Sequence, residues 1–145
     1  STSGNDQVML VTSGGNAIRF KEKDVRPMGR GASGVIGVRM DKDEKVVGAD
    51  IVPSGVEKGL KILVVMGNGY GKRTDLKFYK IQGRGGRGIM TAKITPKTGF
   101  VVASQIIADD KFIVGFNVHV NRTTGKFFGH AIILNPFFHL FNNRF

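Results

Sequence analysis

Two stretches of this sequence align with one another without a gap. They are VMLVTSGGNAIRFKEKDVRPMGRGASGVIGVRMDKDEKVVGADIV at residues 8–52 and ILVVMGNGYGKRTDLKFYKIQGRGGRGIMTAKITPKTGFVVASQI at residues 62–106. Arg19 aligns with Arg73, and Gly34 aligns with Gly88. A repeat of this length is typical of an array of supersecondary units, because one such unit cannot bury its apolar face alone. Function is therefore expected in what the repeats present together.

Each repeat contains four short β-rich runs separated by turn residues. The runs are residues 8–11, 17–20, 35–40 and 46–52 in the first repeat, and 62–66, 72–74, 89–94 and 100–107 in the second. Their composition predicts strands, and no stretch has a helical period of useful length. Four strands at this spacing predict an all-β, propeller-like array of four-stranded antiparallel blades.

The predicted blades are residues 6–54 and 60–108, with residues 53–59 as the linker between them. A third unit begins at Phe112, but the Gly/Arg-rich segment expected after it is absent, so residues 109–145 are predicted to be a partial or irregular unit. We expect residues 1–145 to be a fragment of one larger repeat domain, covering two to three blades.

The end of the chain differs in composition from the repeats. Residues 127–145 hold six of the 11 Phe residues, together with Pro136 and two His residues. Three interpretations remain open from the sequence: a strand that covers the array, a tail that binds a partner, or a segment foreign to the array.

The chain is strongly basic. It has 22 Lys and Arg residues against 11 Asp and Glu residues, a formal net charge of +11, which favours a polyanionic partner. The absence of Cys excludes disulfides and thiolate metal sites and is typical of a reducing compartment. No apolar run reaches the roughly 18 residues needed to span a bilayer, and the N-terminus lacks a signal-peptide pattern. We expect a soluble, cytoplasmic protein with no membrane partner.

Basic side chains are interleaved with glycines in a way that turns alone do not require. Residues 61–93 hold eight basic side chains and one acidic side chain, Asp75. An Arg flanked by Gly offers a phosphate both its guanidinium and nearby exposed backbone N–H groups. Such contacts position duplex DNA without reading its sequence. The residues predicted to form this basic track are Arg30, Arg39, Lys72, Arg73, Arg84, Arg87 and Lys93.

The strand phase supports a track that crosses more than one blade. Arg39 and Lys93 occupy equivalent positions in the two repeats, so they are expected to project from the same face of successive blades. A curved basic track would bend duplex DNA, which costs on the order of 1 to 6 kcal/mol per 20 to 30 base pairs and needs many phosphate contacts.

Two sequence patterns resemble nucleotide-binding motifs, but neither lies in the sequence context that such a motif needs. Residues 29–34 and 83–88 both fit G-x-G-x-x-G, but strand-like residues follow each of them, whereas a dinucleotide site needs a helix there. Gly71 and Lys72 resemble part of a phosphate loop, but Met66 and Arg73 stand where that loop needs Gly and Ser or Thr. Neither pattern predicts a nucleotide site.

Catalytic and metal-binding patterns are equally weak. The three His residues, at 119, 130 and 139, have no cluster of carboxylates or thiolates around them, which disfavours a metal site. Acidic residues at 41–44 and 109–110 are typical of turns rather than of paired catalytic carboxylates. Tyr70 and Tyr79 have no base nearby in the sequence, so core packing or DNA contact is favoured for both. A propeller enzyme with a central active site is disfavoured for the same reasons.

Three segments together resemble the C-terminal domain of the DNA gyrase A protein. They are RPMGRGASGV at residues 26–35, NGYGKRT at residues 68–74 and QGRGGRG at residues 82–88, and the resemblance extends over residues 6–110. It implies a β-pinwheel of six blades, of which this chain would hold late blades. It also implies that the rim of the disc wraps DNA in a positive sense, so that strand passage by the rest of the enzyme introduces negative supercoils.

That family has a basic box with the pattern Gln, basic, Arg, Gly, Gly, basic, Gly. The residues that match it are Gln82, Arg84, Gly85, Gly86, Arg87 and Gly88, whereas Gly83 replaces the basic second residue. In the preceding repeat Met28, Arg30 and Ser33 stand at the box positions, and only Arg30 keeps a charge. The resemblance therefore places the defining first-blade box outside this chain.

The resemblance also implies what this chain does not do. In the family the DNA-cleaving Tyr lies in another domain, ATP binds the gyrase B protein, and the holoenzyme uses ATP and Mg. A non-catalytic, cofactor-free DNA-wrapping fragment of a bacterial type II topoisomerase is thus expected. Its partners would be double-stranded DNA, the gyrase B protein and the remaining parts of the gyrase A protein.

Two other identities stay open from the sequence. The corresponding domain of topoisomerase IV has a related but more eroded box, and a decatenating parent without supercoiling activity would favour it. An Arg-Gly-rich RNA-binding protein would use the same residues in a disordered state on single strands. The regular strand pattern disfavours this second alternative.

Overall fold

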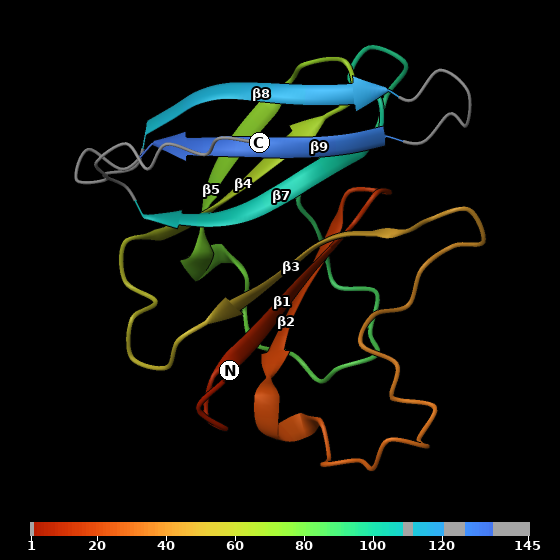
Figure 1. Ribbon diagram of the computed structural model, residues 1–145, viewed down its shortest axis with the longest axis vertical. Coiled ribbons are helices and arrows are strands. Elements are labelled where there is room, and N and C mark those ends of the chain that lie inside the picture. Colours follow the sequence, from red (N-terminus) through yellow and green to blue (C-terminus); the bar gives the residue numbers. More distant parts are fainter. Residues whose placement is uncertain (1, 109–111, 121–126, 135–145) are drawn as a thin grey trace, which may run out of the picture.

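The structure is a computed structural model, and it describes residues 2–108, 112–120 and 127–134 (Figure 1). The described part contains β-strands and two short 3-10 turns, so the predicted all-β class is confirmed. The strands are β1 (Gln7–Thr12), β2 (Asn16–Lys21), β3 (Val46–Val52), β4 (Leu60–Met66), β5 (Gly71–Asp75), β6 (Ile89–Met90), β7 (Val101–Ala108), β8 (Phe112–Val120) and β9 (Phe127–Leu134). The 3-10 turns are η1 (Glu22–Asp24) and η2 (Leu76–Phe78).

Both repeats begin with the same tight hairpin. Gly15 in the β1–β2 turn has a φ of 86°, and Gly69 in the β4–β5 turn has a φ of 85°. The N–H of each glycine donates to a carbonyl three residues earlier, that of Thr12 or of Met66, and both distances are 3.0 Å. A positive φ is easily reached only by glycine, so these two residues set the same turn in both repeats.

The first sheet has the strand order β3-β1-β2-β6, so its fourth strand comes from the second repeat. Asn16 and Ala17 of β2 pair antiparallel with Met90 and Ile89 of β6. Beyond β6 the N–H groups of Thr91 and Ala92 both donate to the Gly15 carbonyl, which ends the ladder. The second sheet has the order β5-β4-β7, and among the described residues no fourth strand borders β5.

The prediction that residues 35–40 form a strand within the first repeat is wrong. This segment is irregular, and it is held by the loop before β6 instead of by a sheet edge. The N–H of Gly85 donates to the Gly37 carbonyl at 2.7 Å, and the N–H of Arg39 donates to the Gly86 carbonyl at 2.8 Å. The strand of the second repeat is likewise shorter than the predicted residues 89–94. In the second repeat this segment forms strand β6 because it pairs with the edge strand β2 of the first repeat. The sequence pattern does not reveal which edge lies nearby.

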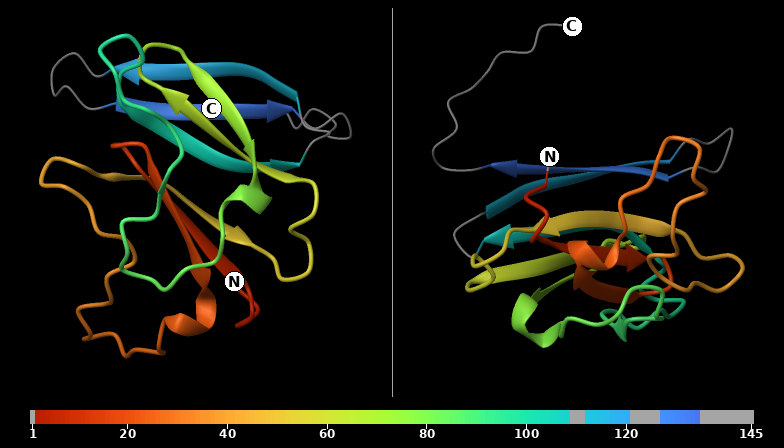
Figure 2. Two further views of the ribbon diagram at one scale, coloured as in Figure 1. Left: turned by 180° about the vertical axis from the view of Figure 1, so that it is seen from behind. Right: turned by 90° about the horizontal axis from the view of Figure 1, so that it is seen from below.

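One hydrophobic cluster joins the two sheets. It contains buried side chains of β1, β3, β4, η2 and β7, namely Met9, Val11, Val52, Ile62, Val64, Leu76 and Val101. The opposite face of the first sheet is covered by a second cluster of Ile18, Phe20 and Val38. Strands β3 and β7 pack together where the sheets meet (Figures 1 and 2). Burial on both sides explains the nearly continuous apolar runs in β1 and β4.

Strand β8 starts at Phe112, where the sequence predicts the start of a third unit, and that division into units stays a prediction. Strand β9 pairs antiparallel with β8 along its length, and it lies next to β7 (Figure 1). Residues 127–134 of the Phe-rich region form strand β9, while residues 135–145 lie outside the described residues, so the choice among the three interpretations of the tail stays open. In the described ranges, no helix has the length and apolar character needed to cross a membrane.

Candidate nucleic-acid interface

The box residues 82–88 form a loop that leaves the second repeat and crosses to the edge of the first sheet. The N–H of Gln82 donates to the Arg19 carbonyl of β2 at 2.8 Å. Gly85 and Gly88 have positive φ values of 77° and 74°, which bend the chain toward β6. A Cβ on Gly88 would overlap the backbone of Ala17, so glycine is needed for this approach.

Arg84 binds the first repeat through two backbone carbonyls. Its Nε donates to the Asp24 carbonyl at 2.9 Å, and its Nη1 donates to the Ile36 carbonyl at 3.1 Å. A guanidinium has five N–H donors, so others remain after these bonds. The side chain therefore fixes the loop on the neighbouring repeat, and its charge stays at a half-buried position near the surface.

Arg87 is directed to the surface and pairs with an acidic residue. Its Nη1 lies 2.9 Å from Oδ1 of Asp41, and the two side chains are 66% and 65% exposed. An exposed pair of this kind contributes little to stability. Such a guanidinium can exchange a carboxylate for a phosphate without unfolding its surroundings.

Two further predicted residues belong to the same region of the first repeat. Arg39 is exposed, and its backbone is bonded to Gly86 of the box loop. The structure thus brings Arg39 together with Arg84 and Arg87. Arg30 is exposed in the loop before residue 34, and its side chain makes no hydrogen bond or ion pair with the rest of the described chain.

The remaining predicted basic residues lie on other elements. Lys72 and Arg73 are exposed on β5, and Lys93 is exposed beyond β6. In residues 2–108, no hydrogen bond or ion pair connects these three side chains to the box loop. Their place in a single DNA track stays a prediction, as does the common direction of Arg39 and Lys93.

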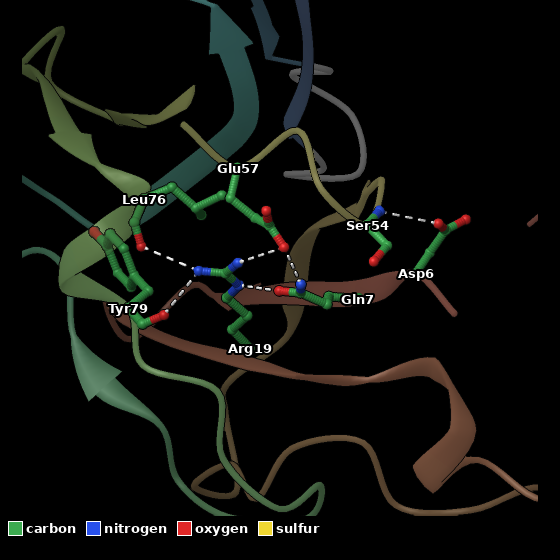
Figure 3. Close-up of polar contacts among 7 residues, drawn as sticks. All are labelled: Asp6, Gln7, Arg19, Ser54, Glu57, Leu76 and Tyr79. Carbon is green, nitrogen blue, oxygen red and sulfur yellow. Dashed lines mark hydrogen bonds and ion pairs between the residues drawn. The ribbon is translucent and has the colours of Figure 1, made fainter. Parts of the chain in front are cut away.

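Arg19, which no sequence pattern singled out as functional, is a buried connector between the repeats (Figure 3). Its side chain is 7% exposed. Nε donates to Oε1 of Gln7 at 2.5 Å, and Nη1 donates to the carbonyls of Leu76 and Tyr79 at 3.4 and 3.2 Å. The signal for this role is a charged residue between buried neighbours in the run NAIRFK of β2.

Glu57 of the linker completes this connector. Its Oε1 accepts a hydrogen bond from Nε2 of Gln7 at 2.5 Å and lies 3.8 Å from Nη2 of Arg19. Burial lowers the pKa of Arg19, and the charge of Glu57 opposes that shift. The backbone N–H of Glu57 itself, followed by the Gln7 amide, lowers the pKa of the Glu57 carboxyl. One arginine therefore ties β2, the linker and η2 together.

A polar hollow lies near the N-terminal end of the described chain, and its volume is about 530 Å³. Its lining includes the basic residues Lys21 and Lys23 beside Ser3 and Ser54. Asp6 is bonded to two of these lining residues: it accepts hydrogen bonds from the Ser3 side chain and backbone and from the Ser54 N–H, and these bonds lower its pKa. Asp6 is thus a structural acceptor.

Neither tyrosine of the repeats is placed for nucleophilic chemistry. Tyr79 is buried, and its hydroxyl is hydrogen-bonded to Thr91. Tyr70 is exposed, and Nζ of Lys97 lies 5.7 Å from the centre of its ring. Within the described ranges, no group of three or more His, Cys, Asp or Glu side chains could hold a metal ion.

Comparisons with known proteins agree with this architecture. The family model for the DNA gyrase C-terminal domain, a beta-propeller, matches residues 6–53 and 67–108. The DNA gyrase A protein of Lawsonia intracellularis is 42% identical over 112 residues, which are 77% of this chain and 14% of that protein. The DNA gyrase A protein of Staphylococcus epidermidis is 40% identical over 110 residues, which are 76% of this chain and 12% of that protein. The chain thus spans a small part of the length of these relatives.

Two solved structures have a similar fold. The DNA gyrase A C-terminal domain gives a TM-score of 0.65 at 29% identity, with 74% of this chain and 36% of that chain covered. The C-terminal domain of DNA topoisomerase IV gives a TM-score of 0.72 at 23% identity, with 90% and 38% covered. The second likeness concerns the fold alone.

Proposed function

Because the chain belongs to the DNA gyrase C-terminal domain family, we propose that it binds duplex DNA without sequence preference and helps to wrap it. In this proposal it is a non-catalytic part of a cytoplasmic gyrase A protein. The remaining parts of that protein and the gyrase B protein, with ATP and Mg, would perform strand passage and negative supercoiling. The observation that carries the proposal is the exposed Arg87 in the box loop, next to Arg39.

In the proposed contact the two box arginines have different roles. Arg84 uses two donors on carbonyls of the first repeat and so orders the loop. Arg87 and Arg39 then present exposed charges from neighbouring segments, and Arg30 adds a third. Contacts of this type go to phosphates and carry no base information. The net charge of +11 adds attraction over the whole surface.

The salt dependence of duplex binding tests this proposal. The logarithm of affinity falls with the logarithm of salt concentration with a slope of about −0.9 per neutralised phosphate. Replacing both box arginines, Arg84→Ala with Arg87→Ala, should therefore flatten the slope by roughly one ion per lost contact. Fluorescence anisotropy with two duplexes of unrelated sequence measures this slope.

Lys58→Ala is the matched control, because it removes one exposed linker charge outside the proposed track. It should lower affinity only slightly and leave the slope near that of the parent chain. An unchanged slope in the double arginine variant would refute the assigned contact. Stronger binding to single-stranded RNA than to duplex DNA in competition would instead favour the Arg-Gly RNA-binding alternative.

Topoisomerase IV is the second candidate parent, and the fold likeness to its C-terminal domain favours it to that extent. The relatives with 40–42% identity are gyrase A proteins, which favours gyrase. A supercoiling assay of the enzyme that contains this chain separates the two. Introduction of negative supercoils supports gyrase, and decatenation without supercoiling supports topoisomerase IV.

A further inference from the structure

The polar hollow of the first repeat is lined by side chains that the proposed DNA track does not use. Its volume is about 530 Å³, which is large enough for a small polar ligand. Gln7 of β1 lies opposite Lys21 of β2 and Val52 of β3, so the hollow lies at the end of the sheet that these three strands form. The lining residues are Ser3, Asn5, Gln7, Lys21, Lys23 and Ser54.

The two carboxylates nearest to the lining residues already have hydrogen-bond partners. Asp6 accepts bonds from the N–H and Oγ of Ser3, at 2.9 and 2.7 Å, and from the Ser54 N–H at 3.2 Å. Glu22 accepts bonds from the N–H groups of Gly4 and Asp6, at 2.9 and 3.3 Å. Donors of the surrounding backbone therefore engage both acidic groups, and neither acidic side chain lines the hollow.

The lining contains hydrogen-bond donors that no group of the chain uses. Gln7 is fully engaged, because both ends of its amide are bonded within the connector of Arg19 and Glu57 (Figure 3). In the described chain, no hydrogen bond or ion pair engages the side chains of Asn5, Lys21, Lys23 and Ser54. An ammonium group only donates, and an amide or a hydroxyl can donate as well. Two positive charges and two neutral donors thus face a space whose complementary ligand is an anion.

The second repeat has a carboxylate at the equivalent place. In the repeat alignment Lys21 corresponds to Asp75, and Lys23 corresponds to Lys77. Asp75 lies between two ammonium groups, because its Oδ1 is 3.8 Å from Nζ of Lys61 and its Oδ2 is 3.2 Å from Nζ of Lys77. In the first repeat a lysine replaces this carboxylate. The chain therefore supplies the anion in the second repeat and leaves its place to an external anion in the first.

The hollow lies near the box loop but apart from the bonds that join the repeats. At the equivalent positions of the second repeat, Asp75 and Lys77 make no hydrogen bond or ion pair with the described residues of the first repeat. Lys23 directly precedes Asp24, whose carbonyl accepts a hydrogen bond from Nε of Arg84 at 2.9 Å. A ligand bound by Lys23 would therefore lie beside the turn η1 on which the box loop is fixed.

We propose that the hollow binds a phosphate group through the ammonium groups of Lys21 and Lys23, with Ser54 and Asn5 as further donors. Lysine binds phosphate as a point charge, so two flexible lysines suffice without the fixed fork of an arginine. Two sources can supply the phosphate: a DNA strand that continues from the box loop, or a small phosphorylated molecule. The first source rests on the proposed function, and the second is independent of it.

Titration of the ¹⁵N-labelled 145-residue chain with inorganic phosphate, at constant ionic strength and followed by NMR, tests the proposal. The amide signals of residues 3–7, 21–23 and 54 should shift together and saturate, with half-saturation at about 1 mM or below. A linear response up to about 50 mM phosphate, or shifts spread evenly over both repeats, would indicate an adventitious ion only and overturn the proposal.

Lys23→Gln and Lys77→Gln form a matched pair, because each removes one exposed lysine from the same position of the repeat. Lys23→Gln should weaken phosphate binding by about fivefold or more, whereas Lys77→Gln should bind like the parent chain. Lys21→Asp reproduces the arrangement of Asp75 beside Lys77, so it should abolish saturable binding. Unchanged amide signals of the second repeat verify that the Lys21→Asp and Lys23→Gln variants fold. Equal phosphate binding by the matched pair would contradict the site.

Duplex DNA separates the two sources of the phosphate. If DNA supplies it, a saturating duplex should prevent inorganic phosphate from shifting the signals of the hollow. Lys23→Gln should then also flatten the salt slope of duplex binding by about 0.9 relative to Lys77→Gln. If a small molecule supplies it, inorganic phosphate should bind with the duplex present, and the two variants should have equal slopes. The phosphate titration contains no DNA, so its failure is distinct from a failure of the proposed duplex binding.

Discussion

Arg19 and Arg73 occupy the same position of the repeat in different surroundings. Arg19 is buried against Gln7, Glu57 and the carbonyls of η2, whereas Arg73 is exposed on β5. At the scale of single residues, the same side chain therefore has two roles. Arg19 holds the following repeat in place, and Arg73 is free to contact a neighbouring repeat or a phosphate.

Arg19→Ala should lower the free energy of unfolding by about 2 to 3 kcal/mol, because it leaves buried acceptors unpaired and removes the connector between the repeats. Urea unfolding followed by circular dichroism measures this loss. Arg73→Ala is the matched control, and its effect should stay within about 0.5 kcal/mol. Equal losses in the two variants would contradict the structural role assigned to Arg19.

At the scale of elements, the short strand β6 joins the two repeats although it has two residues. It completes the first sheet with residues from the second repeat, and its approach depends on Gly88. Strands β3 and β7 form a second junction, where the Asp50 carboxyl of β3 faces the backbone of Ile106 in β7. The two repeats are thus joined at both sides of the first sheet.

Gly88→Ala should cost about 1 to 3 kcal/mol of unfolding free energy, because a φ of 74° is strained for alanine and the methyl group overlaps Ala17. Gly83→Ala is the control, since Gly83 has no positive φ and no atom within 4 Å of a built Cβ. Denaturant midpoints of the two variants separate these effects. Similar midpoints would show that β6 pairing contributes little.

Asp50 makes stability at the β3–β7 junction depend on pH. Burial raises the pKa of its carboxyl, while the Ile106 N–H partly opposes the shift. A raised pKa in the folded state means that the ionised form costs stability above that pKa, and the cost disappears as pH falls through it. Asp50→Asn, which keeps an acceptor oxygen, should therefore raise the denaturant midpoint at about pH 7 and change it little at about pH 3. A larger gain at the lower pH would contradict this sign.

At the scale of the whole molecule, the repeats share a core and a strand, so they should unfold together. Tyr70 and Tyr79 both belong to the second repeat, whereas far-ultraviolet circular dichroism reports on both repeats. Tyrosine fluorescence and circular dichroism should therefore give one coincident urea transition. A tyrosine transition that precedes the dichroism transition would indicate that the repeats unfold separately.

Sequence reasoning reached the fold class, the hairpins and most strands because these follow from local patterns and from the repeat. It missed the sharing of β6 and the irregular path of residues 35–40, since both depend on which edge lies nearby in space. It singled out the box residues, whose role in DNA binding stays a prediction, but it did not reveal the carbonyl partners of Arg84 or the Asp41 partner of Arg87. Arg19 was missed for the same reason: its partners come from three distant segments.

The pair between Arg87 and Asp41 has a consequence for any polyanion that arrives at the box loop. Such a polyanion would have to displace the Asp41 carboxylate from Arg87 before it could bind that guanidinium. Binding of a polyanion at Arg87 would exchange one counter-charge for another, so it would gain less from this side chain than from an arginine without an acidic partner.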